Sequence, residues 1–115
     1  MYFKDNVHEE QTYALLEMFQ VKAITQNIEY GAFAYMVGAT YKAKQIMKCI
    51  DDDKSINLDK FYKTIGVFSS SEQSMLRFAL QCFNSSIDDI KLSDVMRSLD
   101  NMNVKAVKQV IDMRY

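Results

Sequence analysis

The feature that most constrains this chain is the absence of proline together with only three glycines in 115 residues. Proline and glycine mark most turns of β-rich folds, so this chain lacks the turn signals that many short strands require. Apolar residues recur instead at the three- and four-residue spacing of an amphipathic helix along most of the chain. The sequence therefore predicts an all-α protein.

Cap signals and apolar spacing place the first and third helices. Asn6 followed by Glu9 has the spacing of a capping box, which predicts a first helix that begins near Val7. The third helix is expected after residue 40. Its predicted buried positions are Ala43, Ile46, Met47 and Ile50.

The second predicted helix differs from its neighbours because it carries no charge over residues 30–41. Thr25 or Asn27 is suited to cap its beginning, and Gly38 or Thr40 is expected to mark its end. A helix that is apolar nearly all round is typical of the centre of a bundle.

The second half of the chain continues the helical pattern. Asn57 is expected to cap a short helix, and Gly66 is expected to end it in the left-handed conformation. Ser69 with Glu72 forms another capping box, and its helix should stop at residues 84–86.

Two further helices complete the prediction. A short one is expected to begin at Ser93 or Asp94, and a last one is expected to be capped by Asn103. No repeat or long linker divides the chain. We therefore expect residues 1–115 to form one all-α domain, a compact bundle of six to seven short helices.

Composition and charge exclude several classes of protein. The hydrophobic share of 49% and the charged share of 25% are those of an ordinary globular protein, which excludes a disordered tail. A net charge of −1 argues against a dedicated binder of nucleic acid. The sequence shows no signal-peptide pattern and no apolar run near the roughly 20 residues that span a bilayer, so we expect a cytoplasmic protein that does not bind membranes. Cys49 and Cys82 are expected to be reduced and buried.

The acidic run Asp51, Asp52 and Asp53 resembles the first half of a calcium-binding loop. Such a loop needs glycine at its sixth position and glutamate at its twelfth, which here are Ile56 and Tyr62. A solvated turn between helices explains the run better, and we expect neither a metal site nor a cofactor.

Catalytic patterns are also missing from the sequence. His8 is the only histidine and cannot form a multi-histidine metal site, so it is interpreted as a packing or capping residue. Ser69, Ser70 and Ser71 are interpreted as helix-capping residues because no glycine-rich phosphate loop accompanies them. We therefore expect a protein that is not an enzyme.

Clustered lysines leave a DNA-binding alternative open. The basic residues concerned are Lys42, Lys44, Lys48, Lys105, Lys108 and Arg114. Short helices of this kind occur in helix-turn-helix regulators, although the three aspartates follow the first group directly. A solvated charged face is the preferred interpretation, with a helix-turn-helix regulator as the alternative.

Large aromatic and methionine side chains point to a contact surface. The chain has seven tyrosines, seven phenylalanines and eight methionines, and such residues are favoured at protein interfaces. The large side chains that periodicity places least firmly inside are Tyr2, Tyr13, Tyr30, Tyr41, Tyr62 and Met102. From these residues and the acidic run, the candidate partner-binding set is Tyr30, Tyr41, Tyr62, Asp51, Asp52 and Asp53. The interface of a homodimer is one place where such side chains would be buried.

Four motifs occur in a fixed order along the chain: Phe3-Lys4-Asp5-Asn6-x-His8, the run from Gly31 to Gly38, the run from Phe78 to Asn84, and Ile111-Asp112-Met113-Arg114-Tyr115. In these motifs the sequence resembles a family of small, uncharacterised helical proteins from Gram-positive bacteria and their phages. The resemblance spans the whole chain, with departures at Gln81, Ser85 and Phe61 or Tyr62.

The resemblance implies a context and carries no catalytic residue over to this chain. It suggests a phage- or prophage-encoded protein that acts in the host cytosol by binding and inhibiting or redirecting a host protein. Such a partner would be a toxin ribonuclease, a defence enzyme, or a transcription or replication factor. The expected function is that of a non-enzymatic protein-interaction module.

Overall fold

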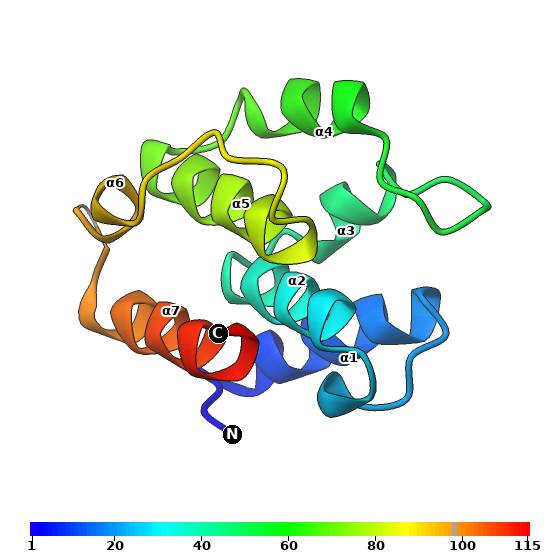
Figure 1. Cartoon of the computed structure of the whole chain (residues 1–115), viewed down its shortest axis with the longest axis horizontal. Coiled ribbons are helices and arrows are strands. Elements are labelled where there is room, and N and C mark those ends of the chain that lie inside the picture. The colour runs from blue at the N-terminus through cyan, green and yellow to red at the C-terminus, as the bar shows by residue number, and fades with distance from the viewer. Residues whose placement is uncertain (98) are drawn as a thin grey trace.

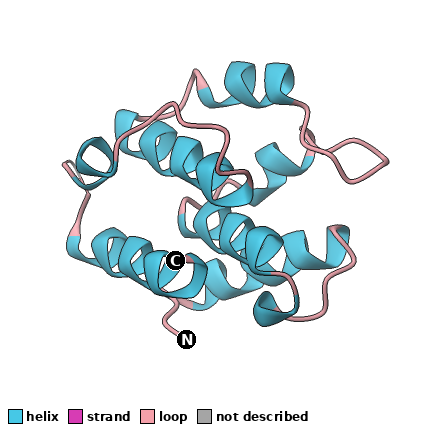
Figure 2. Ribbon diagram, in the orientation of Figure 1, coloured by secondary structure: helices cyan, strands magenta, loops and turns pink. Residues whose placement is uncertain are grey.

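The computed structural model describes residues 1–97 and 99–115, which form helices joined by loops (Figure 2). Their bounds are α1 Asn6–Met18, α2 Ile28–Ala39, α3 Ala43–Met47, α4 Leu58–Ile65, α5 Ser70–Phe83, α6 Leu92–Met96 and α7 Asn101–Arg114, with a 3-10 turn at Ile24–Gln26. The predicted all-α fold of six to seven helices is confirmed for this part of the chain. The described residues contain one isolated β-bridge, between Ile50 and Ile56.

Side chains of Asp, Asn and Ser cap the N-termini of five of the described helices. The Asn57 cap of α4 and the Ser69–Glu72 capping box of α5 are present as predicted, and Asn27 caps α2. Two predicted caps were wrong. Asp5 caps α1 in place of Asn6, and Asp100 caps α7 in place of Asn103.

A common physical reason explains both corrections. Each aspartate accepts a hydrogen bond from the backbone N–H three residues later, at His8 and Asn103 respectively. A carboxylate at this position also interacts favourably with the positive end of the helix dipole, which a neutral asparagine does not.

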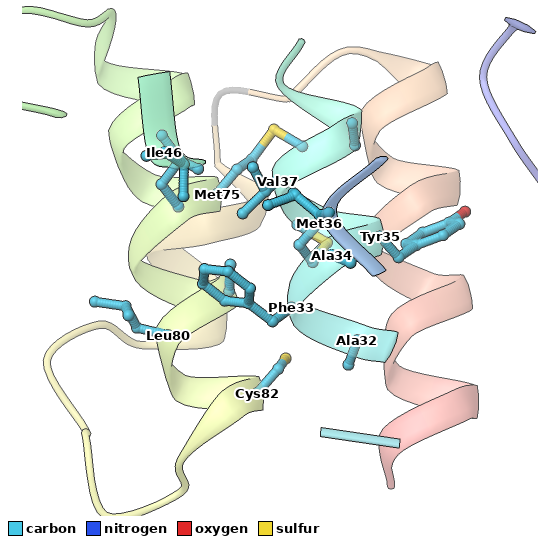
Figure 3. Close-up of a cluster of buried hydrophobic side chains, with 14 of the residues drawn as sticks. Ala32, Phe33, Ala34, Tyr35, Met36, Val37, Ile46, Met75, Leu80 and Cys82 are labelled. Atoms are coloured by element: carbon cyan, nitrogen blue, oxygen red, sulfur yellow. The ribbon is translucent and has the colours of Figure 1, made fainter. Parts of the chain in front are cut away.

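Helix α2 is the centre of the bundle, as its uncharged sequence predicts. Residues 31–39 are all buried, and α1, α5 and α7 pack around them. Figure 3 shows Phe33 and Val37 directed towards α5, while Tyr35 points to the other side, towards α7. Covering α2 on several sides removes its whole apolar surface from water, which is the main favourable term in folding.

Helices α1 and α7 lie on the same side of the bundle, and both chain termini lie there (Figure 1). The last turn of α7 is fixed to α5 because the Arg114 Nε–H donates to the Cys82 carbonyl oxygen at 2.9 Å. A cation at this place satisfies a carbonyl at the carboxyl end of α5 and interacts favourably with the helix dipole.

Gly66 does not have the predicted left-handed conformation. Its φ of −60° is right-handed, and helix α4 ends there in an ordinary turn. The residues that do have left-handed backbone angles are Gln20, Tyr41 and Lys54, which no sequence rule for glycine could identify.

Cys49 and Cys82 are both free and buried, as predicted. Burial raises the pKa of the Cys82 thiol to about 12, so this group stays protonated near neutral pH. Of the helices in the described residues, none combines the length and the apolar character that a bilayer crossing requires.

Candidate functional site

The acidic run forms the tip of a short hairpin that extends from the bundle between α3 and α4 (Figure 1). The hairpin, residues 49–57, is closed by the Asn57 N–H, which donates to the Cys49 carbonyl at 2.7 Å. Nearer the tip, the Asp51 N–H donates to the Ser55 carbonyl and the Lys54 N–H donates to the Asp51 carbonyl, each at 2.9 Å. These bonds hold the backbone of the aspartates in a defined turn.

The three aspartates of this acidic hairpin have different surroundings. Asp53 accepts hydrogen bonds from the Ser55 hydroxyl at 2.6 Å and the Ser55 N–H at 3.0 Å, and these bonds lower the pKa of its carboxyl group. Asp51 and Asp52 are exposed. With the single ammonium of Lys54, three carboxylates leave the tip with a formal charge of −2. In the described residues no three His, Cys, Asp or Glu side chains are arranged to hold a metal ion.

A groove of about 290 Å³ lies between the acidic hairpin, the beginning of α2 and the end of α5. We call it the Tyr30 groove. Its residues come from three separate segments of the chain and are Tyr30, Asp53, Lys54, Ser55, Ile56, Leu58, Phe83, Asn84 and Ile87. The structure thus brings Tyr30 and Asp53, two of the six predicted binding residues, into one site.

The apolar side of the Tyr30 groove is supported from beneath by other aromatic rings. The ring centroid of Tyr30 lies 4.5 Å from that of Phe19 and 5.3 Å from that of Phe83. Phe83 in turn packs edge-on against the fully buried Phe33, at 5.7 Å. Aromatic pairs in this distance range add stability beyond their buried area, so the groove is largely preformed.

Tyr41 lies outside the Tyr30 groove and is held by internal contacts. Its hydroxyl donates to the Asp5 carboxylate, and the Lys4 ammonium lies 4.4 Å from its ring centroid. Burial and the hydrogen bond to Asp5 raise the pKa of Tyr41 to about 12. Although 39% of the residue is exposed, Tyr41 joins the end of α2 to the beginning of α1.

Tyr62 is likewise held by internal contacts. Its hydroxyl donates to Asp89 at 2.7 Å, and the Arg77 guanidinium lies 5.2 Å from its ring centroid. Arg77 also pairs with Asp89 at 3.1 Å. The three side chains connect α4, α5 and the loop after α5. Burial and the bond to Asp89 raise the pKa of Tyr62 to about 12.

The basic residues do not form one surface of free charges. Lys42 lies 3.8 Å from Glu72 and over the ring of Phe68, and Arg114 binds the Cys82 carbonyl. Of the other basic residues, Lys44 and Lys48 precede the acidic hairpin, and Lys105 and Lys108 are exposed on α7.

His8 is a packing residue, as predicted, and is completely buried between α1 and α2. The structure holds both of its ring nitrogens in hydrogen bonds, to the Lys4 N–H at 3.1 Å and to the Tyr35 carbonyl at 2.9 Å. Neither nitrogen is left for a general acid or base, since both have internal partners.

The sequence did not single out Ile56, Leu58, Phe83 and Ile87 as lining of a groove. Leu58 begins α4 and Phe83 ends α5, and only the contact between these segments turns the two side chains into a shared surface. The chain matches no protein-family model, no curated protein and no solved structure.

Proposed function

We propose that this protein is a non-enzymatic interaction module that binds a partner protein through the Tyr30 groove and the acidic hairpin. The observation that carries the proposal is the convergence of Tyr30 and Asp53, from segments 23 positions apart in the sequence, on one apolar groove with an acidic edge. Interfaces of this kind combine a desolvated apolar centre with a charged rim.

The occupant that fits this surface is a segment of a partner protein with an apolar side chain beside lysine or arginine. The apolar side chain enters between Tyr30, Leu58 and Ile87, and its burial contributes about 1.5–3 kcal/mol. The basic residue lies opposite the hairpin tip, whose charge of −2 attracts it and speeds the encounter. A stable complex buries about 1,200–2,000 Å² in total, so residues around the groove also take part.

The partner we propose is a host protein in the cytosol, on the basis of the resemblance to proteins of Gram-positive bacteria and their phages. Toxin ribonucleases, defence enzymes, and transcription or replication factors are the classes concerned, and several of them carry basic surfaces that contact nucleic acid. An acidic hairpin beside an apolar groove is suited to cover such a surface.

A DNA-binding regulator remains the alternative, supported by the exposed Lys105 and Lys108, which lie on one face of α7. Asp112 follows one turn later, and α3, which carries Lys44, has only five residues. A positive surface on this scale neutralises few phosphates, which would leave the binding weak.

The test is affinity capture from host lysate, followed by calorimetry with the identified partner. Asp51→Lys/Asp52→Lys reverses the charge of the hairpin tip and Leu58→Glu places a charge in the groove, and each should weaken binding at least about tenfold. Their matched controls are Glu10→Lys/Asp112→Lys, with the same change in net charge, and Val67→Glu, at a position 87% exposed outside the groove.

The controls should bind within about twofold of the unmodified protein. The proposal is wrong if no stoichiometric partner is captured, or if the control variants lose as much affinity as the groove variants.

A further inference from the structure

Residues 1–5 form a short segment that leads into α1 at the edge of the bundle (Figure 1), and their hydrogen bonds reach α1, α2 and α7. We call them the N-terminal strap. The Tyr2 N–H donates to Gln109 Oε1 of α7 at 3.1 Å, and the Tyr2 carbonyl accepts a hydrogen bond from the hydroxyl of Tyr35 in α2. The strap therefore bridges α7 and α2, which are distant from it in sequence.

Phe3 of the strap packs against the rings of His8, Tyr13 and Tyr35, and we call the place that its ring fills the slot. The ring centroid of Phe3 lies 5.1 Å from that of His8, 5.6 Å from that of Tyr35 and 6.2 Å from that of Tyr13. His8 and Tyr35 have no exposed surface beneath it. None of these residues lines the Tyr30 groove, so the slot is a separate feature of the molecule.

His8 holds the strap at one further point, in addition to the bond from the Lys4 ammonium to the Ala39 carbonyl at 2.8 Å. The Lys4 N–H donates to His8 Nδ1 at 3.1 Å, which requires the proton of the neutral ring to be on Nε2. Nε2 then donates to the Tyr35 carbonyl at 2.9 Å. In this tautomer the neutral imidazole accepts a hydrogen bond from the strap and donates one to α2 at the same time.

Protonation of the imidazole would break this arrangement. A second proton turns Nδ1 from an acceptor into a donor that faces the Lys4 N–H, so the two donors oppose each other. It also places a charge on a completely buried side chain, and that burial lowers the pKa of His8.

The groups around His8 include both signs of charge. On the strap, the Lys4 ammonium disfavours the charged ring and the Asp5 carboxylate favours it. Tyr35 on α2 and Tyr41 after α2 are neutral near pH 7, because the pKa of each is raised. The Asp100 carboxylate, at the start of α7, attracts the Lys4 ammonium and favours its charged form.

We propose that residues 1–5 are an acid-released strap, which leaves the bundle when His8 is protonated and uncovers the slot formed by His8, Tyr13 and Tyr35. The strap can leave while the bundle remains, because α2 keeps its contacts with α1, α5 and α7. Release of the strap is then coupled to the uptake of one proton. At pH values where His8 is protonated in the open form and neutral in the closed form, the fraction of open molecules increases about tenfold for each pH unit of acidification.

Amide hydrogen exchange measured by NMR between pH 7.5 and 4.5 tests this proposal. Below pH 6.5, the ordinary pKa of histidine, the protection factor of the Lys4 N–H should fall about tenfold per pH unit and stay well below that of the Val37 N–H in α2, which exchanges only through global unfolding. Contacts between the Phe3 and Tyr35 rings in nuclear Overhauser spectra should disappear over the same range, and the far-ultraviolet circular dichroism should not change.

The proposal is overturned if Lys4 and Val37 have the same protection factor at every pH, because the strap then opens only by global unfolding. Constant protection at Lys4 down to pH 4.5 would overturn it equally. His8→Gln provides a second comparison, because glutamine does not titrate here and strap opening should then be independent of pH. If that variant does not fold, the comparison of Lys4 with Val37 in the unmodified protein still decides the question.

Discussion

Gly38 of α2 lies so close to Thr12 of α1 that a Cβ atom on the glycine would stand 2.6 Å from the Thr12 Oγ1 atom and 3.0 Å from the His8 carbonyl oxygen. The Thr12 hydroxyl cannot easily turn away, because it donates to that carbonyl at 2.8 Å. The close contact between α1 and α2 therefore requires glycine, which has no Cβ atom, at position 38.

Gly38→Ala should lower the free energy of unfolding by about 1–3 kcal/mol, because overpacking forces the two helices apart. Chemical denaturation measures this loss. Gly66→Ala is the matched control, since a Cβ there meets only ordinary contacts at 3.4 Å and φ is already −60°. It should be neutral or stabilise the protein by up to about 1 kcal/mol. Equal losses in both variants would contradict the prediction.

The pH dependence of stability should reflect His8. Because the pKa of His8 is lowered by burial in the folded state, the unfolded chain binds more protons below pH 6.5. The free energy of unfolding should therefore decrease as the pH falls from 6.5 towards the folded-state pKa, and change little above 6.5. Denaturation curves at several pH values measure this decrease.

The control for the His8 prediction comes from a second group. The pKa of Asp5 is lowered by hydrogen bonds from Tyr41 and from the His8 N–H, so its stabilising effect is lost only below pH 3.8. His8→Gln should flatten the profile above pH 5 and leave the loss below pH 3.8. An unchanged profile between pH 6.5 and 5 would rule out His8 as the cause.

Lys54→Gly should stabilise the hairpin by about 0.5 kcal/mol. Lys54 has a φ of 70°, which is unfavourable for a residue with a side chain and available to glycine. The gain is partly offset by the greater freedom of glycine in the unfolded chain. Lys54→Ala removes the same charge and keeps the backbone strain. In thermal denaturation the glycine variant should have the higher midpoint, and the opposite order would refute the argument.

A gel-shift assay with random duplex DNA separates the two functional classes. The protein should cause no retardation at micromolar concentration in low salt, because its exposed lysines are spread over several segments and its net charge is −1. Retardation that is lost steeply with added salt, and that Lys105→Glu/Lys108→Glu abolishes, would favour the DNA-binding alternative.

The fold could be predicted from the sequence where its cause is local. The Ser69–Glu72 capping box depends on two residues three positions apart, and the central place of α2 follows from its uncharged run. Two caps were misplaced because several suitable residues lie within one turn of each other, Asp5 and Asn6 at α1 and Asp100 and Asn103 at α7, and the pattern alone does not rank them.

The site could be predicted only in part, because its geometry depends on distant contacts. Tyr41 is joined to Asp5, 36 positions away, and Tyr62 to Asp89, 27 positions away, and neither pairing has a sequence signal. The Tyr30 groove combines three segments for the same reason. Sequence patterns identify side chains suited to an interface, whereas their surroundings in the folded chain decide which of them share a surface.

The most direct test of the proposed function is NMR mapping of the binding surface with the captured partner. On titration with the partner, the largest amide shift changes should occur at Tyr30, in the acidic hairpin and around Ile87, with little change along the exposed face of α7. Changes concentrated on α7, with the amides of the Tyr30 groove unaffected, would contradict the proposal.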